Sequence, residues 1–275
     1  MELLDNSITF LATTKSWLKV VIFFLTWIIF WSPFGIYLGK KLKWQFPKPL
    51  KIEQKMPLVI SLYLIAPIVL WGMVQIKGES WFNYGLQWQI NLFLSLILGL
   101  LIGILGVIIT FYLQFLLNWI QWNSENLIKI KEFVLPVLAL GIGISFIEEV
   151  IFRGFLIYEF QQSFSLMMAA IISSLIFALL HLIWDYKNAI TQLPGLFLMG
   201  LILVLARIIN DGSIGLAWGL HSGWILGLTC IDSAKIIFYN KEVSPWFTGF
   251  NEDPLAGISG IFCLVMTGTI LYCFI

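Results

Sequence analysis

The sequence predicts an all-α, polytopic membrane protein with about eight transmembrane helices. Of its 275 residues, 60% are hydrophobic and only 11% are charged, and the mean hydropathy is +0.93. A soluble domain of this size would expose many more Lys, Arg, Asp and Glu side chains, because these residues are rarely buried without partners. The formal net charge of +1 gives no electrostatic basis for binding nucleic acid. We therefore expect an integral, multi-pass protein surrounded by membrane lipids, with no nucleic-acid partner.

Eight apolar runs are candidates for membrane spans, because a spanning helix needs about 20 apolar residues at a rise of about 1.5 Å each. The sixth and seventh runs are short enough for one of them to be re-entrant. No long-period repeat or low-complexity linker divides the chain, so residues 1–275 are expected to form a single membrane domain. The eight runs are residues 17–38, 57–76, 91–117, 133–158, 164–186, 192–209, 213–230 and 257–275.

A dense cluster of lysines predicts the orientation of the chain. Six of the sixteen basic residues lie between Lys40 and Lys55, and lysines next to a membrane span usually mark the cytoplasmic side. With eight spans, both termini would then face away from the cytoplasm.

Two adjacent glutamates, Glu148 and Glu149, interrupt the fourth apolar run, and Arg153 follows them. A charge near the bilayer centre costs roughly 2.5 to 3.5 kcal/mol, so such groups usually face a protein interior or a wet cavity and often have a function. Glu149 and Arg153 are four residues apart on one face of a helix, where they can form an ion pair. Successive helical residues point about 100° apart, so Glu148 is free for a different role. An interhelical polar clasp formed by the three residues is the structural alternative.

The chain has two histidines, His181 and His221, and both lie inside apolar runs. Asp185 follows His181 by four residues, at the spacing that would let it orient the imidazole. Gly219 and Gly223 flank His221 and allow close approach by another helix or by a substrate. A single membrane histidine is more often a hydrogen-bonded packing residue, whereas two histidines together with a diglutamate favour a functional site.

A glutamate and two histidines suffice for two related hydrolytic mechanisms. A carboxylate and an imidazole can hold and deprotonate a water molecule that attacks an amide. The same groups can instead bind zinc and leave one coordination position to a water. Neither the HExxH motif of helical zinc proteases nor a GxSxG nucleophile motif is present. The cofactor prediction is therefore either none or Zn²⁺, and the possible metal ligands are Glu148, His181 and His221.

Three motifs in this order resemble the signature of the CPBP intramembrane proteases, relatives of the CAAX prenyl endopeptidase that are also called Abi proteins. The resemblance extends over about residues 133–230, which it identifies as the catalytic core. The motifs are Glu148-Glu149-x-x-x-Arg153, Phe177-x-x-x-His181 and His221.

The resemblance implies a role for each motif residue. Glu148 would activate the hydrolytic water with the help of His181, while His221 would stabilise the tetrahedral oxyanion. The implied activity is that of an intramembrane endopeptidase, which cleaves prenylated CAAX-type or otherwise hydrophobic protein and peptide substrates. The residues with supporting roles would be Glu149, Arg153 and Phe177.

One position departs from the family pattern. The third motif usually has Asn or Asp four residues after its histidine, and here that position is Ile225. An apolar side chain cannot donate to an oxyanion. A non-catalytic membrane scaffold or a bacteriocin-immunity-type protein of the same fold is therefore the second interpretation. A proton-coupled transporter is the third, because intramembrane Glu, Arg and His also form ion pathways.

The predicted spans place two of the proposed catalytic residues at different depths. Glu148 lies roughly 22 Å from the cytoplasmic start of its span and His181 lies roughly 8 Å from that side, at about 1.5 Å per residue. A kink near Pro136, a helix tilt or shifted helix boundaries would bring the two residues to one level.

Overall fold

The computed structural model describes residues 14–45, 50–184 and 186–273. This part of the chain is almost entirely helical, in agreement with the predicted all-α class, and each predicted apolar run forms a helix. A small antiparallel sheet was not predicted: β1 (Ile120–Trp122) pairs with β2 (Ile237–Tyr239). Strands of three residues are too short to show an alternating pattern, so sequence periodicity does not reveal them.

The helices keep the order of the predicted runs. The long helices are α2 (Ser16–Lys41), α3 (Ile52–Lys77), α4 (Ile90–Leu116), α5 (Ile130–Glu148), α7 (Leu166–Leu180), α8 (Tyr186–Ile209), α9 (Gly215–Ala234) and α11 (Ile258–Tyr272). The short helices are α6 (Ile157–Gln161) and α10 (Pro245–Thr248). The 3-10 turns are η1 (Trp81–Tyr84), η2 (Ser124–Lys129), η4 (His181–Ile183), η5 (Phe250–Glu252) and η6 (Pro254–Ala256). A π-helix, η3 (Glu149–Leu156), joins α5 to α6.

Within the described ranges, six segments are long and apolar enough to cross a membrane, where about eight were predicted. α11 is apolar but has only 15 residues. α9 has 20 residues, and its glycine, histidine, serine and aspartate residues make it less apolar. The first half of α9, residues 215–224, is buried in the protein, so this helix needs little apolar surface toward lipid. The six apolar segments make this an integral, multi-pass membrane protein. They are Ser16–Lys41, Glu53–Lys77, Ile90–Leu116, Ser124–Gln161, Leu166–Ile183 and Tyr186–Ile209.

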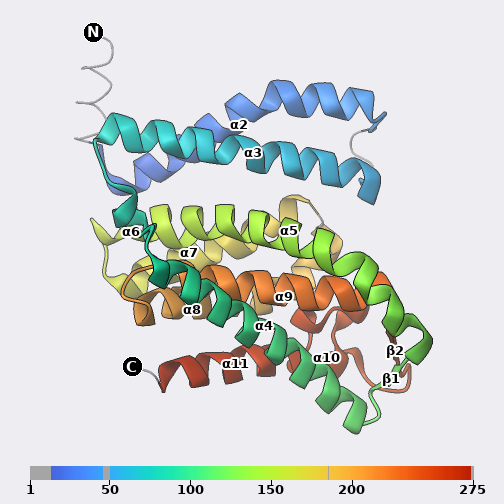
Figure 1. Cartoon of the computed structure of the whole chain (residues 1–275). Helices are drawn as coiled ribbons and strands as arrows, with labels where there is room; N and C mark the ends of the chain where they lie inside the picture. Colours follow the sequence, from blue (N-terminus) through green and yellow to red (C-terminus); the bar gives the residue numbers. More distant parts are fainter. Residues whose placement is uncertain (1–13, 46–49, 185, 274–275) are drawn as a thin grey trace.

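The helices are arranged in layers (Figure 1). α2 and α3 lie side by side on one side of the bundle, α5, α7, α8 and α9 occupy the centre, α11 lies on the other side, and α4 crosses in front of α9. Two indole N–H groups join α2 to α3: Trp27 donates to Leu62 O at 2.8 Å and Trp31 donates to Ser61 Oγ at 2.9 Å. The start of α2 and the end of α11 lie at the same end of the bundle, as expected for an even number of crossings.

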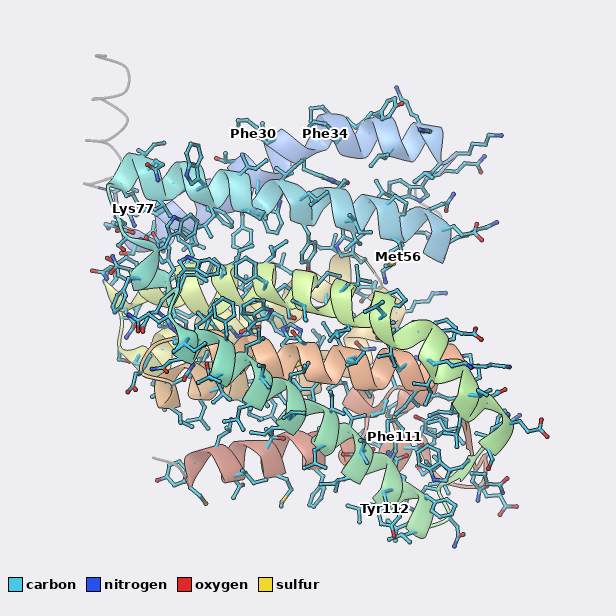
Figure 2. The ribbon with its side chains drawn as sticks, viewed as in Figure 1. Phe30, Phe34, Met56, Lys77, Phe111 and Tyr112 are labelled. Carbon is cyan, nitrogen blue, oxygen red and sulfur yellow. The ribbon has the colours of Figure 1, made fainter. Side chains whose placement is uncertain are left out.

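The outer surface of the bundle is apolar. Phe30 and Phe34 project from α2 on the side away from the other helices (Figure 2), and they are 62% and 58% exposed. On α4, Phe111 is buried whereas its neighbour Tyr112 is exposed (Figure 2). Continuous apolar surface of this kind is unusual in a water-soluble monomer and is what contact with lipid requires.

Glycines bring α4 and α9 into backbone contact beside His221. A Cβ atom on Gly219 would lie 2.1 Å from Leu96 O, and a Cβ atom on Gly223 would lie 2.5 Å from Leu100 O. A larger residue at either position would therefore push the two helices apart. The small residues around His221 permit the close helix approach that the sequence suggested.

The π-helix η3 follows directly after α5, where hydropathy predicted an uninterrupted helix. π-helical segments close i→i+5 hydrogen bonds, are rare and frequently occur at functional sites. The backbone of η3 is supported from α8, because the guanidinium of Arg207 donates to the carbonyl oxygens of Arg153 and Gly154. The same guanidinium donates to Asn83 O at 3.1 Å and to Gly212 O at 2.9 Å. Arg207 thus ties the π-helix to η1 and to the turn that precedes α9.

Candidate active site

The three residues predicted to be catalytic line one cavity of about 280 Å³. Glu148 enters from the end of α5, His181 from η4 and His221 from the middle of α9. Glu148 and His221 are 5% and 4% exposed, and His181 is half-buried. These residues are up to 73 positions apart in the sequence, and the packing of α4, α5, α8 and α9 around the cavity brings them together.

Glu148 and His181 line the same cavity, although the predicted spans place them at different depths. The apolar segment that carries Glu148, Ser124–Gln161, has 38 residues, whereas the segment Leu166–Ile183 has only 18. α5 extends past the centre of the bundle toward the sheet (Figure 1). The two segments therefore differ in length by 20 residues (38 against 18).

The carboxylate of Glu148 has two partners. The hydroxyl of Tyr63 on α3 donates to Glu148 Oε1. His221 Nε2 lies 3.5 Å from Glu148 Oε2. Sequence reasoning missed Tyr63, because α3 carries no recognisable motif and the two residues are 85 positions apart.

Glu149 makes different contacts from Glu148, in line with the divergence of adjacent helical positions. Its Oε1 atom accepts from Arg153 Nη1 at 3.1 Å and lies 2.8 Å from His221 Nδ1. Glu149 is fully buried and does not line the cavity. Its carboxylate therefore holds the imidazole of His221 and the guanidinium of Arg153 behind the cavity wall.

The imidazole of His221 lies between the two glutamates, with one ring nitrogen toward each carboxylate. A carboxylate can only accept a hydrogen bond, so Nδ1 carries the proton that is shared with Glu149. When Nε2 is also protonated, the ring donates on both sides, and its Nε2–H faces the cavity side of the site. Glu149 thus sets the orientation of His221.

His181 is oriented by the main chain. Its Nδ1 atom lies 2.8 Å from Phe177 O, and because a carbonyl oxygen only accepts, Nδ1 carries the proton. In the neutral imidazole, Nε2 is then an acceptor that can take a proton from water. Asp185, which was expected to orient this ring, lies outside the described residues.

Phe177 packs against the charged and imidazole groups of the site. The guanidinium of Arg153 lies 4.4 Å from the centre of the Phe177 ring. The rings of His181 and His221 meet it edge to face, with centroids 4.8 Å and 6.0 Å away. Phe177 is fully buried, so its ring keeps the two imidazoles at a constant spacing and provides a cation–π contact for the guanidinium.

Glu148, His181 and His221, the possible zinc ligands predicted from the sequence, all line this cavity, and a role for zinc stays a prediction. Within residues 14–45, 50–184 and 186–273, no three His, Cys, Asp or Glu side chains are grouped as a metal site. One ring nitrogen of His221 lies 2.8 Å from Glu149 Oε1, and the other lies 3.5 Å from Glu148 Oε2.

The rest of the cavity wall is mostly apolar and includes Ile225. A second, more polar cavity of about 430 Å³ adjoins it. The two cavities share Phe111, Leu228, Thr229 and Pro254, and the polar one also contacts Asp232, Lys235, Glu252 and Asp253 near the sheet. Phe111 is the buried side chain of α4 that Figure 2 labels. The two cavities are thus neighbours: one has a mostly apolar wall, and the other is lined by charged residues near the sheet.

Comparison with protein families identifies the central part of the chain. Residues 130–226 match the family described as type II CAAX prenyl endopeptidase Rce1-like. The matched segment begins with α5, ends in α9 and contains all three motifs. No curated protein and no solved structure matches the chain. The resemblance to CPBP and CAAX proteases predicted from the motifs is confirmed.

Proposed function

Because residues 130–226 are those of the Rce1-like family of type II CAAX prenyl endopeptidases, which are membrane proteases, we propose that this protein hydrolyses a peptide bond in a prenylated or otherwise hydrophobic protein. Cleavage would occur within or near the membrane. The observation that carries the proposal is the convergence of Glu148, His181 and His221 on one cavity.

Glu148 and His181 activate the attacking water. The carboxylate of Glu148 accepts one proton from the water while Nε2 of His181 accepts a hydrogen bond from the other. The water oxygen forms a bond to the carbonyl carbon, and the carbonyl π electrons move to oxygen to give a tetrahedral oxyanion. When the C–N bond breaks, the proton held by Glu148 passes to the leaving amine, and the products are a carboxylic acid and an amine.

His221 stabilises the oxyanion through Nε2–H. Its other nitrogen is held by Glu149 at 2.8 Å, and Glu149 is held in turn by Arg153 at 3.1 Å. This arrangement keeps the donor in place before the substrate binds, so no reorganisation is needed when negative charge develops. Tyr63 orients the carboxylate of Glu148 in the same way.

The apolar wall favours a hydrophobic substrate. Leu196, Met199, Leu228 and Leu264 line the cavity together with Ile225, and sites of this type select apolar groups with a few polar groups for orientation. A lipidated or hydrophobic peptide reaches such a cavity from the membrane, while the adjoining polar cavity supplies water.

The test uses purified protein in lipid vesicles with a farnesylated CAAX-type peptide and a set of unmodified hydrophobic peptides, followed by mass spectrometry. We expect Glu148→Gln and His181→Ala to lower kcat by about 10²- to 10⁴-fold, the usual contribution of general acid–base catalysis. Glu132→Gln, an exposed glutamate in the first turn of α5, is the matched control and keeps wild-type activity. Undiminished cleavage by Glu148→Gln would contradict the assignment.

The same preparation decides the role of a metal. We expect chelator-treated protein without stoichiometric zinc to retain its activity, because the site residues already have partners that compete with a metal. Loss of activity on chelation and its return with zinc would support a metalloenzyme instead.

A non-catalytic scaffold that binds hydrophobic peptides is the second candidate. The observation that favours it is Ile225, whose apolar side chain lines the cavity where the family pattern has a polar residue. A scaffold would bind the peptides without turnover, and Ile225→Asn would create activity that the wild type lacks. Turnover by the wild type would exclude this function as the main one.

A further inference from the structure

The cavity needs a hydrogen-bond donor for the oxyanion beyond His221. Donors aimed at the developing negative charge lower the barrier to amide hydrolysis, and each contributes substantially. His221 has one nitrogen engaged with Glu149, which leaves it a single donor. Ile225 lines the cavity but has no polar hydrogen to donate.

Most polar side chains of the cavity wall have partners elsewhere. Thr110 Oγ1 donates to Gly106 O at 2.8 Å, and Gln192 Nε2 donates to Asp253 Oδ2 at 2.6 Å. Trp224 Nε1 is different, because this buried atom has no hydrogen-bond partner among the described residues. Of the buried, unpartnered side-chain polar atoms in that part of the chain, it alone belongs to a residue that lines this cavity.

An indole N–H that has no hydrogen-bond acceptor in the protein can donate to an acceptor of the substrate. The group can only donate, and leaving it buried and unpaired is unfavourable, so an incoming carbonyl oxygen gains a full hydrogen bond. Nε1 itself is buried, so the indole ring must turn for its N–H to meet an oxygen bound in the cavity. Indole does not change its charge between pH 4 and pH 9, unlike imidazole.

The helical spacing puts this donor beside the other catalytic groups. Trp224 lies three residues after His221 and Ile225 lies four residues after it, and residues three and four apart share one face of a helix. All three side chains line the cavity. The backbone contact of α9 with α4 at Gly219 and Gly223 keeps this face rigid.

We propose that the indole N–H of Trp224 donates to the carbonyl oxygen of the scissile peptide bond and to the oxyanion formed from it, in place of the amide or carboxyl side chain that Ile225 has replaced. This role presupposes the endopeptidase function proposed above. The indole transfers no proton. It holds the oxygen while the water oxygen bonds to carbon, and it releases the new carboxylic acid after the C–N bond breaks.

The test is the kinetic effect of Trp224→Phe in the full-length protein, which removes the N–H and keeps an aromatic ring. We expect kcat to fall about 10²-fold, the loss typical of one oxyanion donor, while KM changes by less than about twofold, because the contact is made in the transition state. Trp224→His, which retains a ring N–H, loses less activity than Trp224→Phe.

Trp218→Phe is the matched control. Trp218 is a buried tryptophan on the same helix, its Nε1 donates to Ile142 O at 2.9 Å, and it does not line the cavity. We expect this substitution to lower thermal stability and to leave kcat within about threefold of wild type, because it removes a structural hydrogen bond and no oxyanion donor.

Rescue by a restored amide separates a missing donor from a distorted site. Adding Ile225→Asn to Trp224→Phe should raise kcat at least about tenfold, and more than the same change does in the wild type, because the two donors serve one oxygen. If Trp224→Phe does not fold, Trp224→His with and without Ile225→Asn gives the same comparison.

The outcomes separate the role of Trp224 from the function of the protein. Wild-type cleavage with unchanged kcat in folded Trp224→Phe overturns the role of Trp224 and leaves the endopeptidase function standing. Absence of cleavage by the wild type for every peptide tested overturns both. A fall in kcat without rescue by Ile225→Asn assigns Trp224 to packing and also overturns its role as a donor.

Discussion

Replacing Arg153 by methionine would test whether the buried ion pair stabilises the site. Arg153 is 1% exposed, and its guanidinium lies 3.1 Å from Glu149 Oε1 and 4.4 Å from the ring centre of Phe177. Methionine has a similar length and no charge. The substitution therefore leaves Glu149 fully buried without its cationic partner.

The expected loss of stability is large. Two unit charges 3.1 Å apart attract each other by about 5 kcal/mol at an effective dielectric constant of about 20. Removing one partner of a buried ion pair costs about 3–5 kcal/mol, out of a total unfolding free energy of about 5–15 kcal/mol. Since about 1 kcal/mol shifts the Tm of a chain of this size by about 2–4 °C, we expect a decrease of roughly 6–20 °C.

The assay is thermal unfolding of the purified protein in detergent, followed by tryptophan fluorescence. The double variant Glu149→Gln/Arg153→Met should recover more than half of the lost Tm, because the unpaired charge is gone. Lys131→Met, which removes an exposed charge in the first turn of α5, is the matched control. The reasoning is refuted if Arg153→Met unfolds within about 2 °C of wild type, or if the double variant is no more stable than Arg153→Met.

Two further predictions concern packing and pH. Gly219→Ala would put a Cβ atom 2.1 Å from Leu96 O, so α9 must shift. We expect a lower Tm and a kcat at least tenfold lower, on the order that small misplacements of catalytic groups cost. The control Gly143→Ala, whose Cβ atom meets no atom within 4 Å, should leave Tm and kcat near wild type, and equal behaviour of the two variants would contradict the packing explanation. Burial raises the pKa of Asp253, whose Oδ2 accepts from Gln192 Nε2. Because the folded-state pKa lies above the unfolded value, the stabilisation is full below the unfolded pKa and is lost as pH rises through the folded pKa. The Tm of wild type relative to Asp253→Asn should therefore increase as pH falls from about 7.5 to about 4, and a difference that does not vary with pH would argue against this linkage.

Much of the fold could be predicted because hydropathy and helix length are local properties. Each apolar run became a helix, and the membrane class followed from composition alone. The number of spans could not be predicted in the same way. α9 is enclosed by other helices, so its composition is set by packing against protein rather than by contact with lipid, and β1 and β2 pair across more than 110 residues.

In the candidate site, too, some contacts could be predicted from the sequence and others could not. The pairing of Glu149 with Arg153 follows from their spacing within one helix and could be predicted. The contact of Tyr63 with Glu148 could not, because it joins α3 to α5 and no sequence pattern links them. The unpartnered indole N–H of Trp224 could not be predicted either, since a tryptophan in an apolar helix is usually a packing or interfacial residue.

The order of the motifs in the sequence was enough to predict the resemblance that the family match over residues 130–226 confirms, and to name the residues from which a site could be built. Only the tertiary structure decided which contacts those residues make: His221 lies between two carboxylates, His181 is oriented by Phe177 O, and Ile225 and Trp224 line the same cavity. The physical reason is that motif spacing constrains direction within one helix, whereas convergence depends on how closely helices approach. Here that approach is set by the glycine contact of α4 with α9 and by the π-helix after Glu148.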